Sequence, residues 1–231
     1  MSRFRTRMPG PAFAPARPAH PAAEAPRQFR SLAATELYCP RCRQATPVRE
    51  PVVLLGESFS GLVAVRLAAR QPVGLAGLVL VASFLRYPPA RAFLFSTLAR
   101  DLLFRVTPPA ALLRMLLLGM DAPDALVEAA RAAIRRVDAE VLARRLRAVL
   151  AADVRANLAG TRMPVLYLGG FHDRLVGRWA AEQVKVVRPD SEVLVLDAPH
   201  LVLQRRAEEA AAALTAFAGR CAAPAAGRRE A

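Results

Sequence analysis

Four short apolar runs separated by helical stretches constrain the fold of this chain more than any other feature of its sequence. The runs are rich in Val and Leu and show little alternation between apolar and polar residues, which is typical of strands covered on both faces of a parallel sheet. Ala-rich segments with helical spacing connect them. The sequence therefore predicts an α/β fold with a mostly parallel sheet of about four strands. The predicted strands are 51–55, 78–82, 164–168 and 192–196.

The chain divides into segments of different composition. Residues 1–50 are rich in Pro and Arg and lack apolar periodicity. They cannot bury enough apolar area to offset the entropy cost of ordering, so we expect a disordered leader. Residues 51–85 and 164–219 are expected to form the core. Residues 86–163 show only helical patterns and are interpreted as an inserted helical cap, and 220–231 as a disordered tail.

Local signals mark the starts of four helices in the predicted cap. The Pro-Pro steps at 88–89 and 108–109 are each expected to begin a helix, because proline is favoured in the first turn. Asp121, with Pro123 in the first turn, is expected to cap a third helix, and Asp138 a fourth.

Residues 112–120 are apolar almost all the way round a predicted helix. A buried helix explains this composition, and so does a helix with part of its surface facing an apolar substrate cavity. Both interpretations can hold together. The candidate pocket residues are Leu112, Leu116 and Met120.

The step from the first predicted strand to its helix carries a candidate nucleophile, Ser58. The hexapeptide 56–61 reads G-E-S-F-S-G. A sharp turn between strand and helix needs small residues around the serine, because larger side chains would collide with the neighbouring elements. The pattern departs from G-x-S-x-G, since Ser60 stands at its last position and glycine follows one place later. An ordinary capped helix start is the alternative interpretation.

Two partners for this serine follow the third and fourth predicted strands. Asp173 and His200 complete the chain order Ser, Asp, His, and the carboxyl ends of parallel strands share one edge of a sheet. His200 would accept the proton of Ser58, and Asp173 would hold the imidazole in the required tautomer. We expect His172 to be a solvent-facing loop residue. Asp197 is the second candidate for the acid, although its position suits support of the histidine loop better.

These motifs resemble the α/β-hydrolase superfamily, in particular small bacterial carboxylesterase-like members with segments like G-E-S-F-S-G, G-G-F-H-D-R-L-V-G and D-A-P-H-L-V-L-Q. The resemblance covers about residues 50–218. It implies an eight-stranded fold with a helical cap, a triad of Ser58, Asp173 and His200, and hydrolysis of carboxylic esters or thioesters. The Phe59 N–H would be one oxyanion donor. The implied partner is a small acyl ester, with no metal or organic cofactor.

The sequence also departs from that superfamily. Its members place four strands before the nucleophile, and residues 1–50 contain no comparable strand pattern. We therefore expect a partial α/β-hydrolase fold whose first strand is an apolar edge open to association. A missing second oxyanion donor would cost on the order of 3 kcal/mol of transition-state stabilisation. The hypothesis is an N-terminally incomplete hydrolase, and a catalytically inactive fragment is the alternative.

Charge and cysteine content bear on other classes of protein. The formal net charge is +14, yet basic and aromatic residues do not interleave, so nucleic-acid binding is a lesser alternative without a dedicated site. Cys39 and Cys42 resemble half of a zinc ribbon, but no second pair follows, which favours free thiols. The longest uncharged stretch, 71–85, is shorter than the roughly 18 residues of a membrane span. An odd cysteine count without a secretory signal predicts a cytoplasmic protein.

Overall fold

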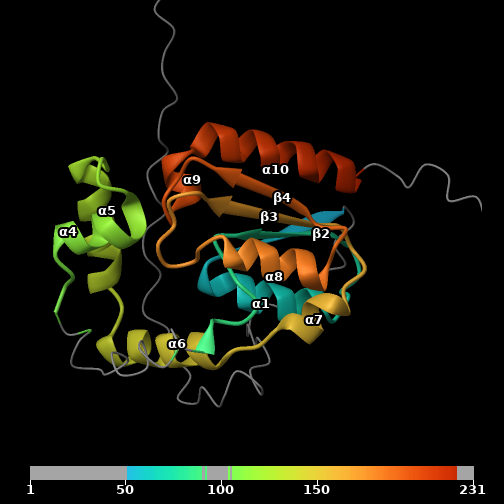
Figure 1. Ribbon diagram of the computed structural model, residues 1–231, viewed down its shortest axis with the longest axis horizontal. Helices are drawn as coiled ribbons and strands as arrows, with labels where there is room; N and C mark the ends of the chain where they lie inside the picture. Colours follow the sequence, from blue (N-terminus) through green and yellow to red (C-terminus); the bar gives the residue numbers. More distant parts are fainter. Residues whose placement is uncertain (1–50, 90–91, 93–103, 105, 223–231) are drawn as a thin grey trace, which may run out of the picture. The chain divides into compact units, whose positions relative to one another are not determined.

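The structure, a computed structural model, describes residues 51–89, 92, 104 and 106–222 (Figure 1). The predicted leader, with its two cysteines, lies outside the described residues. So do most of the helix predicted at the Pro-Pro step 88–89 and residues 223–231 of the predicted tail.

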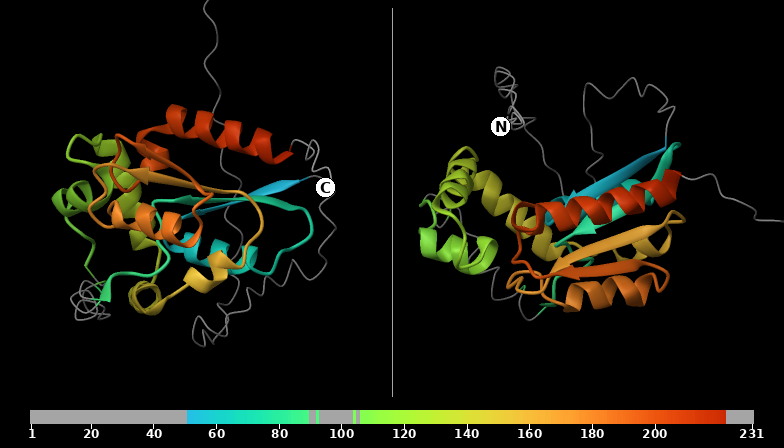
Figure 2. Two further views of the ribbon diagram at one scale, coloured as in Figure 1. Left: turned by 45° about the vertical axis from the view of Figure 1, so that its right-hand side comes forward. Right: turned by 90° about the horizontal axis from the view of Figure 1, so that it is seen from above.

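Within the described residues, four parallel strands form one sheet in the order β1-β2-β3-β4. Both views in Figure 2 show the strands running the same way. This arrangement confirms the α/β prediction, and each end of an observed strand lies within three residues of the predicted end. Their bounds are β1 (Val52–Glu57), β2 (Leu75–Val81), β3 (Val165–Gly170) and β4 (Glu192–Leu196).

Helices cover both faces of this sheet, as Figure 1 shows. On one face lie α1, α7 and α8, and on the other lie α9 and α10. The predicted closing helix is α10. It includes residues 220–222 of the predicted tail, so the expectation of disorder is wrong for these three residues. The bounds are α1 (Phe59–Ala68), α7 (Arg155–Ala159), α8 (Trp179–Val187), α9 (Val202–Arg205) and α10 (Ala207–Ala222).

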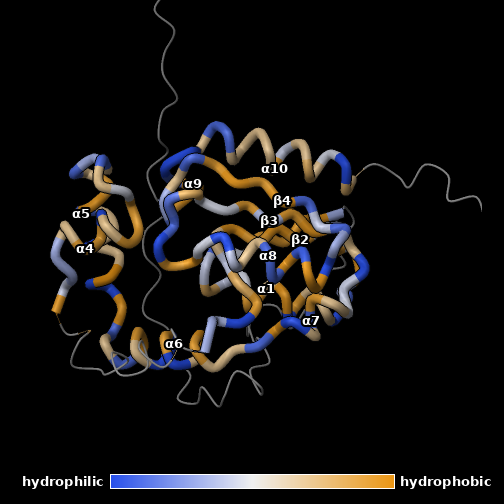
Figure 3. The backbone as a smooth tube through the Cα atoms, in the orientation of Figure 1, coloured by the Kyte–Doolittle hydropathy of each residue, from blue (hydrophilic) through white to orange (hydrophobic). Residues whose placement is uncertain are grey.

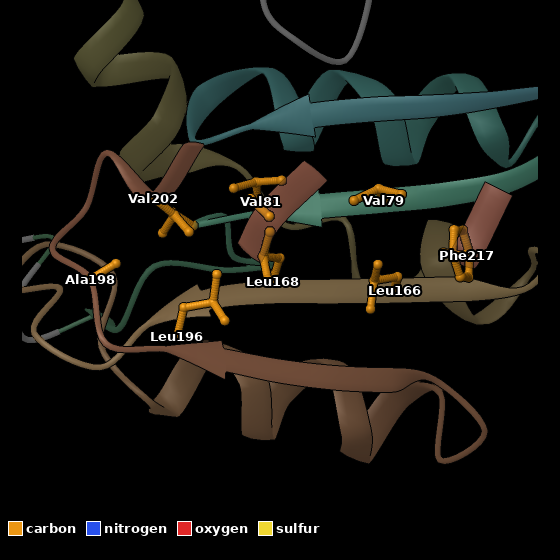
Figure 4. Close-up of a cluster of buried hydrophobic side chains, with 10 residues drawn as sticks. Val79, Val81, Leu166, Leu168, Leu196, Ala198, Val202 and Phe217 are labelled. Carbon is orange, nitrogen blue, oxygen red and sulfur yellow. The ribbon is translucent and has the colours of Figure 1, made fainter. Parts of the chain in front are cut away.

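A hydrophobic core cluster of the described residues lies between the sheet and the pair α9 and α10. β2, β3 and β4 each contribute side chains to it, as Figure 4 shows. Figure 3 shows the hydrophobic residues concentrated along the inner strands. The continuous apolar runs of the sequence are explained by this burial, because the central strands are covered on both sides. The labelled members are Val79, Val81, Leu166, Leu168, Leu196, Ala198, Val202 and Phe217.

The first strand is an edge of the sheet within the described residues, as the sequence predicted. Val52 and Leu55 of β1 are 40% and 39% exposed, respectively. Unpaired backbone groups beside apolar side chains favour pairing with another chain. Association through this edge stays a prediction.

Helices alone follow β2 in the described part of the cap, apart from a single bridge between Arg86 and Asp153. The expected start at the Pro-Pro step 108–109 is confirmed, since Pro109 is the N-cap residue of α4. Asp138 is likewise at the N-cap of α6, although its side chain makes no capping hydrogen bond. The cap elements are α4 (Ala110–Leu113), the π-helical turn η2 (Arg114–Leu118), α5 (Asp124–Arg135) and α6 (Ala139–Ala151).

Two expectations for the cap are wrong. Asp121 does not cap a helix, because Pro123 is the N-cap residue of α5 and the Asp121 carboxylate accepts a hydrogen bond from Arg205 instead. The apolar segment 112–120 is not one buried helix either. It is helical through α4 and η2 as far as Leu118 and then turns, and it is only partly buried, with Leu112 39% and Met120 66% exposed. No helix in the described part of the chain has the length and apolar character needed to span a membrane.

Candidate active site

Ser58 lies at the junction of β1 and α1 with a strained backbone, φ 52° and ψ −119°. A non-glycine residue in such a conformation costs about 1–3 kcal/mol and needs support from its surroundings. Two hydrogen bonds supply it. The Ser58 N–H donates to the Val81 carbonyl at 2.8 Å, and the buried Ser83 hydroxyl donates to the Ser58 carbonyl at 2.9 Å. The end of β2 therefore holds the turn that presents the candidate nucleophile.

The two glycines of the turn fit where no side chain could. A Cβ atom at Gly56 would lie 2.6 Å from the Gly61 Cα, and one at Gly61 would lie 2.0 Å from the Ser83 Oγ. Ser60, by contrast, is exposed, and its hydroxyl exchanges two 2.8 Å hydrogen bonds with the backbone N–H and carbonyl of Glu57. The departure from G-x-S-x-G is thus explained, because the close approach that requires glycine falls at residue 61.

The structure brings the three predicted site residues together in one hydrogen-bonded chain. His200 Nε2 lies 2.9 Å from Ser58 Oγ, and His200 Nδ1 lies 2.8 Å from Asp173 Oδ2. The Asp173 side chain is fully buried, and that of His200 is 4% exposed. This burial protects the hydrogen bonds from competition with water.

Backbone amides fix the carboxylate of Asp173. Its Oδ1 accepts hydrogen bonds from the N–H groups of Leu175 at 2.9 Å and Val176 at 2.8 Å, which leaves Oδ2 for His200. The phenol of Tyr167 in β3 lies close enough to Asp173 for the carboxylate charge to affect its pKa. Burial first and this charge second raise the pKa of Tyr167, which therefore stays neutral.

The two loops that carry Asp173 and His200 lie side by side. The His172 N–H donates to the Ala198 carbonyl at 2.9 Å. A Cβ atom at Gly170 would come within 2.3 Å of the Pro199 carbonyl oxygen, so glycine is required for the loops to approach this closely. Glycine at the end of β3 thus helps to place the acid beside the imidazole.

The second candidate acid, Asp197, lies outside this chain of bonds. Its Oδ1 is 2.8 Å from His172 Nε2, and its Oδ2 accepts a hydrogen bond from Arg206 at 3.0 Å. These contacts, that of His172 first, lower the pKa of Asp197. The His172 side chain is 62% exposed, as expected of a solvent-facing residue. Its pairing with Asp197 was not foreseen, because the sequence predicts that the two loops meet but not which of their side chains pair.

Glu57 is a charged neighbour of the candidate nucleophile that the sequence did not single out as functional. Burial raises the pKa of Glu57, while a hydrogen bond from Gln204 and the nearby His200 oppose that shift. Its Oε1 is buried without a hydrogen-bond partner among the described residues. The carboxyl group is therefore close to the imidazole without being its main acceptor.

The Phe59 N–H, predicted as an oxyanion donor, belongs to the first residue of α1. The first four N–H groups of a helix have no acceptor within the helix, so this donor remains available beside Ser58. Across the described residues, no group of three or more His, Cys, Asp or Glu side chains is arranged to hold a metal ion.

A cavity of about 320 Å³ lies where the cap meets the loops of the triad. Met120 lines it, whereas Leu112 and Leu116 do not. Arginine and aspartate side chains make up much of its wall, so this cavity differs from the apolar one expected from residues 112–120. A role for the two leucines in substrate binding stays a prediction.

Comparison with known proteins gives one family and many similar structures. A model described as the alpha/beta hydrolase family matches residues 3–213. The match thus includes most of the segment interpreted above as a leader. No match was found among curated proteins.

Three solved structures illustrate the likeness in fold. An enol-lactonase from Burkholderia xenovorans LB400 is 23% identical with a TM-score of 0.64, over 73% of this chain and 66% of its own. A thermophilic esterase from Thermogutta terrifontis is 22% identical with a TM-score of 0.64, over 75% and 66%. A hydrolase from Pseudomonas aeruginosa PA01 is 25% identical with a TM-score of 0.56, over 74% and 65%. The chain therefore spans just under two thirds of the length of these proteins.

Proposed function

The chain belongs to the alpha/beta hydrolase family, and from that premise we propose that it is a serine hydrolase that cleaves carboxylic esters or thioesters of small molecules. One observation carries the proposal. The hydrogen-bonded chain from Asp173 through His200 to Ser58 has both of its links at 2.8–2.9 Å. Such a chain is the arrangement that activates a serine hydroxyl.

The proposed reaction begins with acylation of Ser58. Its Oγ attacks the carbonyl carbon of the ester while His200 Nε2 takes the hydroxyl proton. Asp173 accepts the Nδ1–H bond and stabilises the imidazolium that forms. The Phe59 N–H donates to the oxyanion of the tetrahedral intermediate, and one such donor is worth on the order of 3 kcal/mol. The intermediate collapses, and the leaving alcohol or thiol takes the proton from His200.

Deacylation repeats these steps with water. His200 removes a proton from a water molecule, which attacks the acyl carbonyl and forms a second tetrahedral intermediate. When that intermediate collapses, the Ser58 oxygen leaves and recovers its proton from the imidazolium. The products are a carboxylic acid and the free enzyme.

The test compares the protein with its Ser58→Ala variant on p-nitrophenyl esters of short and medium acyl chains. We expect turnover by the original chain and a loss of about 10⁴-fold or more in kcat for the variant, because the nucleophile is removed. A fluorophosphonate should label the original chain at Ser58. The Ser60→Ala variant, which lacks the neighbouring hydroxyl of the same turn, should still be labelled. Neither turnover nor labelling of the folded original chain would contradict the proposal and favour an inactive hydrolase fold.

A further inference from the structure

The cavity between the cap and the triad loops has no role in the proposed reaction. Its lining includes His172 and Pro199, which immediately precede Asp173 and His200 in the chain. Its volume of about 320 Å³ falls at the lower end of the range for sites that bind small molecules. A space of this size, one residue away from two members of the triad, is well placed to hold part of a substrate.

The charge of the wall indicates which chemical group would fit. Arginine exceeds aspartate in the lining, and such an excess attracts anions. The charged lining residues other than histidine are Arg114, Arg174, Arg205, Arg206, Asp121 and Asp197.

Three of these arginines already have acidic partners. Arg205 donates to Asp121 at 2.6 Å, and Arg206 donates to Asp197 at 3.0 Å. Arg114 pairs with Asp124, which lies outside the lining. These pairs neutralise the carboxylates of the wall, so the aspartates do not present unpaired charge to an incoming anion.

Arg174 differs from the other three. It is exposed, and among the described residues no carboxylate lies within ion-pair distance of it. A free guanidinium presents two parallel N–H donors, which match the two oxygens of a carboxylate. In the described part of the chain, the wall therefore offers one arginine without an acidic partner beside three arginines that each have one.

The distance from this cavity to the nucleophile suits a short aliphatic spacer. Pro199 and His200 are consecutive, and His200 Nε2 lies 2.9 Å from Ser58 Oγ. The Pro199 Cα therefore lies at most on the order of 10 Å from Ser58 Oγ, because the path between them runs through the 3.8 Å between neighbouring Cα atoms and one imidazole side chain. Met115 and Met120 also line the cavity, and their flexible side chains can contact a hydrocarbon chain.

We propose that this cavity binds a carboxylate carried by the substrate, with Arg174 as its partner. The protein would then prefer esters in which a few methylene groups separate the scissile carbonyl from a terminal carboxylate. This inference rests on the proposed serine hydrolase function and adds the substrate class to it.

The test uses two p-nitrophenyl esters of equal length, the monoester of adipic acid and the same compound with its carboxylate replaced by a primary amide. We expect kcat/KM to be higher for the acid than for the amide. In Arg174→Gln the ratio of the two values should fall roughly fivefold or more, because a charge-assisted hydrogen bond is lost at a partly exposed site. The matched control is Arg162→Gln, which removes one positive charge at the amino end of β3, away from the cavity, and should leave the ratio unchanged.

A second experiment tests whether a free carboxylate binds in the same site as the substrate. Free adipate should inhibit hydrolysis of the adipate monoester competitively, and the inhibition should weaken in Arg174→Gln. Adipate binding without competition, measured by calorimetry and steady-state kinetics, would indicate a separate anion site and overturn the inference.

The outcomes also separate this inference from the proposed function. Turnover of both esters with the same ratio in the original chain and in Arg174→Gln would overturn the carboxylate site and leave the serine hydrolase standing. Failure to hydrolyse either ester, together with no fluorophosphonate labelling, would overturn the serine hydrolase and the carboxylate site with it.

Discussion

The two ends of the sheet carry hydrogen-bonded networks built from similar parts. At the carboxyl ends of the strands, a hydroxyl, an imidazole and a carboxylate are joined in the candidate active site. At the amino ends, Arg188 joins the carboxylate of Asp190 to the hydroxyl of Thr161. Arg188 and Thr161 are buried like Asp173 and His200, whereas the Asp190 side chain is 64% exposed. The hydrogen bonds of the two networks are also distributed in different ways.

The network at the amino end uses every donor it has. The five N–H groups of Arg188 make five hydrogen bonds, to Asp190, Thr161 and the Met163 carbonyl. The Thr161 hydroxyl in turn donates to the Leu158 carbonyl at 2.7 Å. The entry to β3 is therefore tied to the end of α8 with no donor left for a ligand.

The network at the carboxyl end leaves groups unmatched. The Ser58 hydroxyl has His200 as its partner, its backbone is strained, and the neighbouring Phe59 N–H is free of an intrahelical acceptor. Full satisfaction of polar groups stabilises a fold, whereas a reaction needs a nucleophile beside a base and a hydrogen-bond donor that still lacks an acceptor. We therefore expect the amino end to contribute mainly to stability and the carboxyl end to carry the proposed chemistry.

The largest expected effect comes from Asp173→Asn. The asparagine oxygen would keep the two backbone N–H bonds, so its NH₂ group would face His200 Nδ1 and force the proton onto Nε2. The imidazole could then not accept the proton of Ser58, and we expect kcat at neutral pH to fall about 10⁴-fold. The urea midpoint should change little, and a loss of stability in place of activity would break the division between the two ends.

The next effect comes from Arg188→Ala. Removal of the guanidinium leaves buried acceptors on Thr161 and Met163 without donors, so we expect the free energy of unfolding to fall by about 2–4 kcal/mol. Urea denaturation measures this change. The matched control, Arg162→Ala, removes an exposed arginine of the same region and should stay within about 0.5 kcal/mol of the original. A similar loss in both variants would show that the buried network has no special role.

The smallest effect is the pH dependence of the Arg188 pair. The hydrogen bond from Arg188 lowers the pKa of Asp190 from 3.8 to about 2. A lowered pKa in the folded state means that the stabilisation is fully present above about pH 4 and is lost as the pH falls towards 2. In urea denaturation, Asp190→Asn should therefore be less stable than the original chain at pH 7, and the difference should shrink at pH 2. An equal difference at both pH values would mean that the charge of Asp190 contributes nothing.

The sequence predicted the features that depend on local pattern. The apolar runs identified the four strands of the described residues. The chain order Ser58, Asp173, His200 identified the residues that meet at one edge, because parallel strands place their carboxyl ends together. The sequence could not predict which side chains from distant parts of the chain form hydrogen bonds with one another. Asp121 looks like a helix cap but bonds to Arg205, whose position 84 residues away is set by the fold.

The charged cavity was missed for the same reason. Arg114 is the one charged residue of the segment 112–120. The other basic residues of the cavity wall are Arg174, from the loop after β3, and Arg205 and Arg206, from the end of α9. Basic residues are so frequent in this chain that no local pattern distinguishes an arginine beside the triad from one on an outer surface. The folded positions of both the loops and the cap were needed to make that distinction.

The contact between Gly61 and Ser83 has a consequence for redesign of the nucleophile turn. An added Cβ atom at residue 61 would lie 2.0 Å from the Ser83 Oγ. A larger residue at position 61 therefore needs a smaller one at position 83, and the two positions must be mutated together. A library that randomises the hexapeptide alone would discard every larger residue at position 61, whereas one that also samples glycine at position 83 would open new shapes beneath the serine.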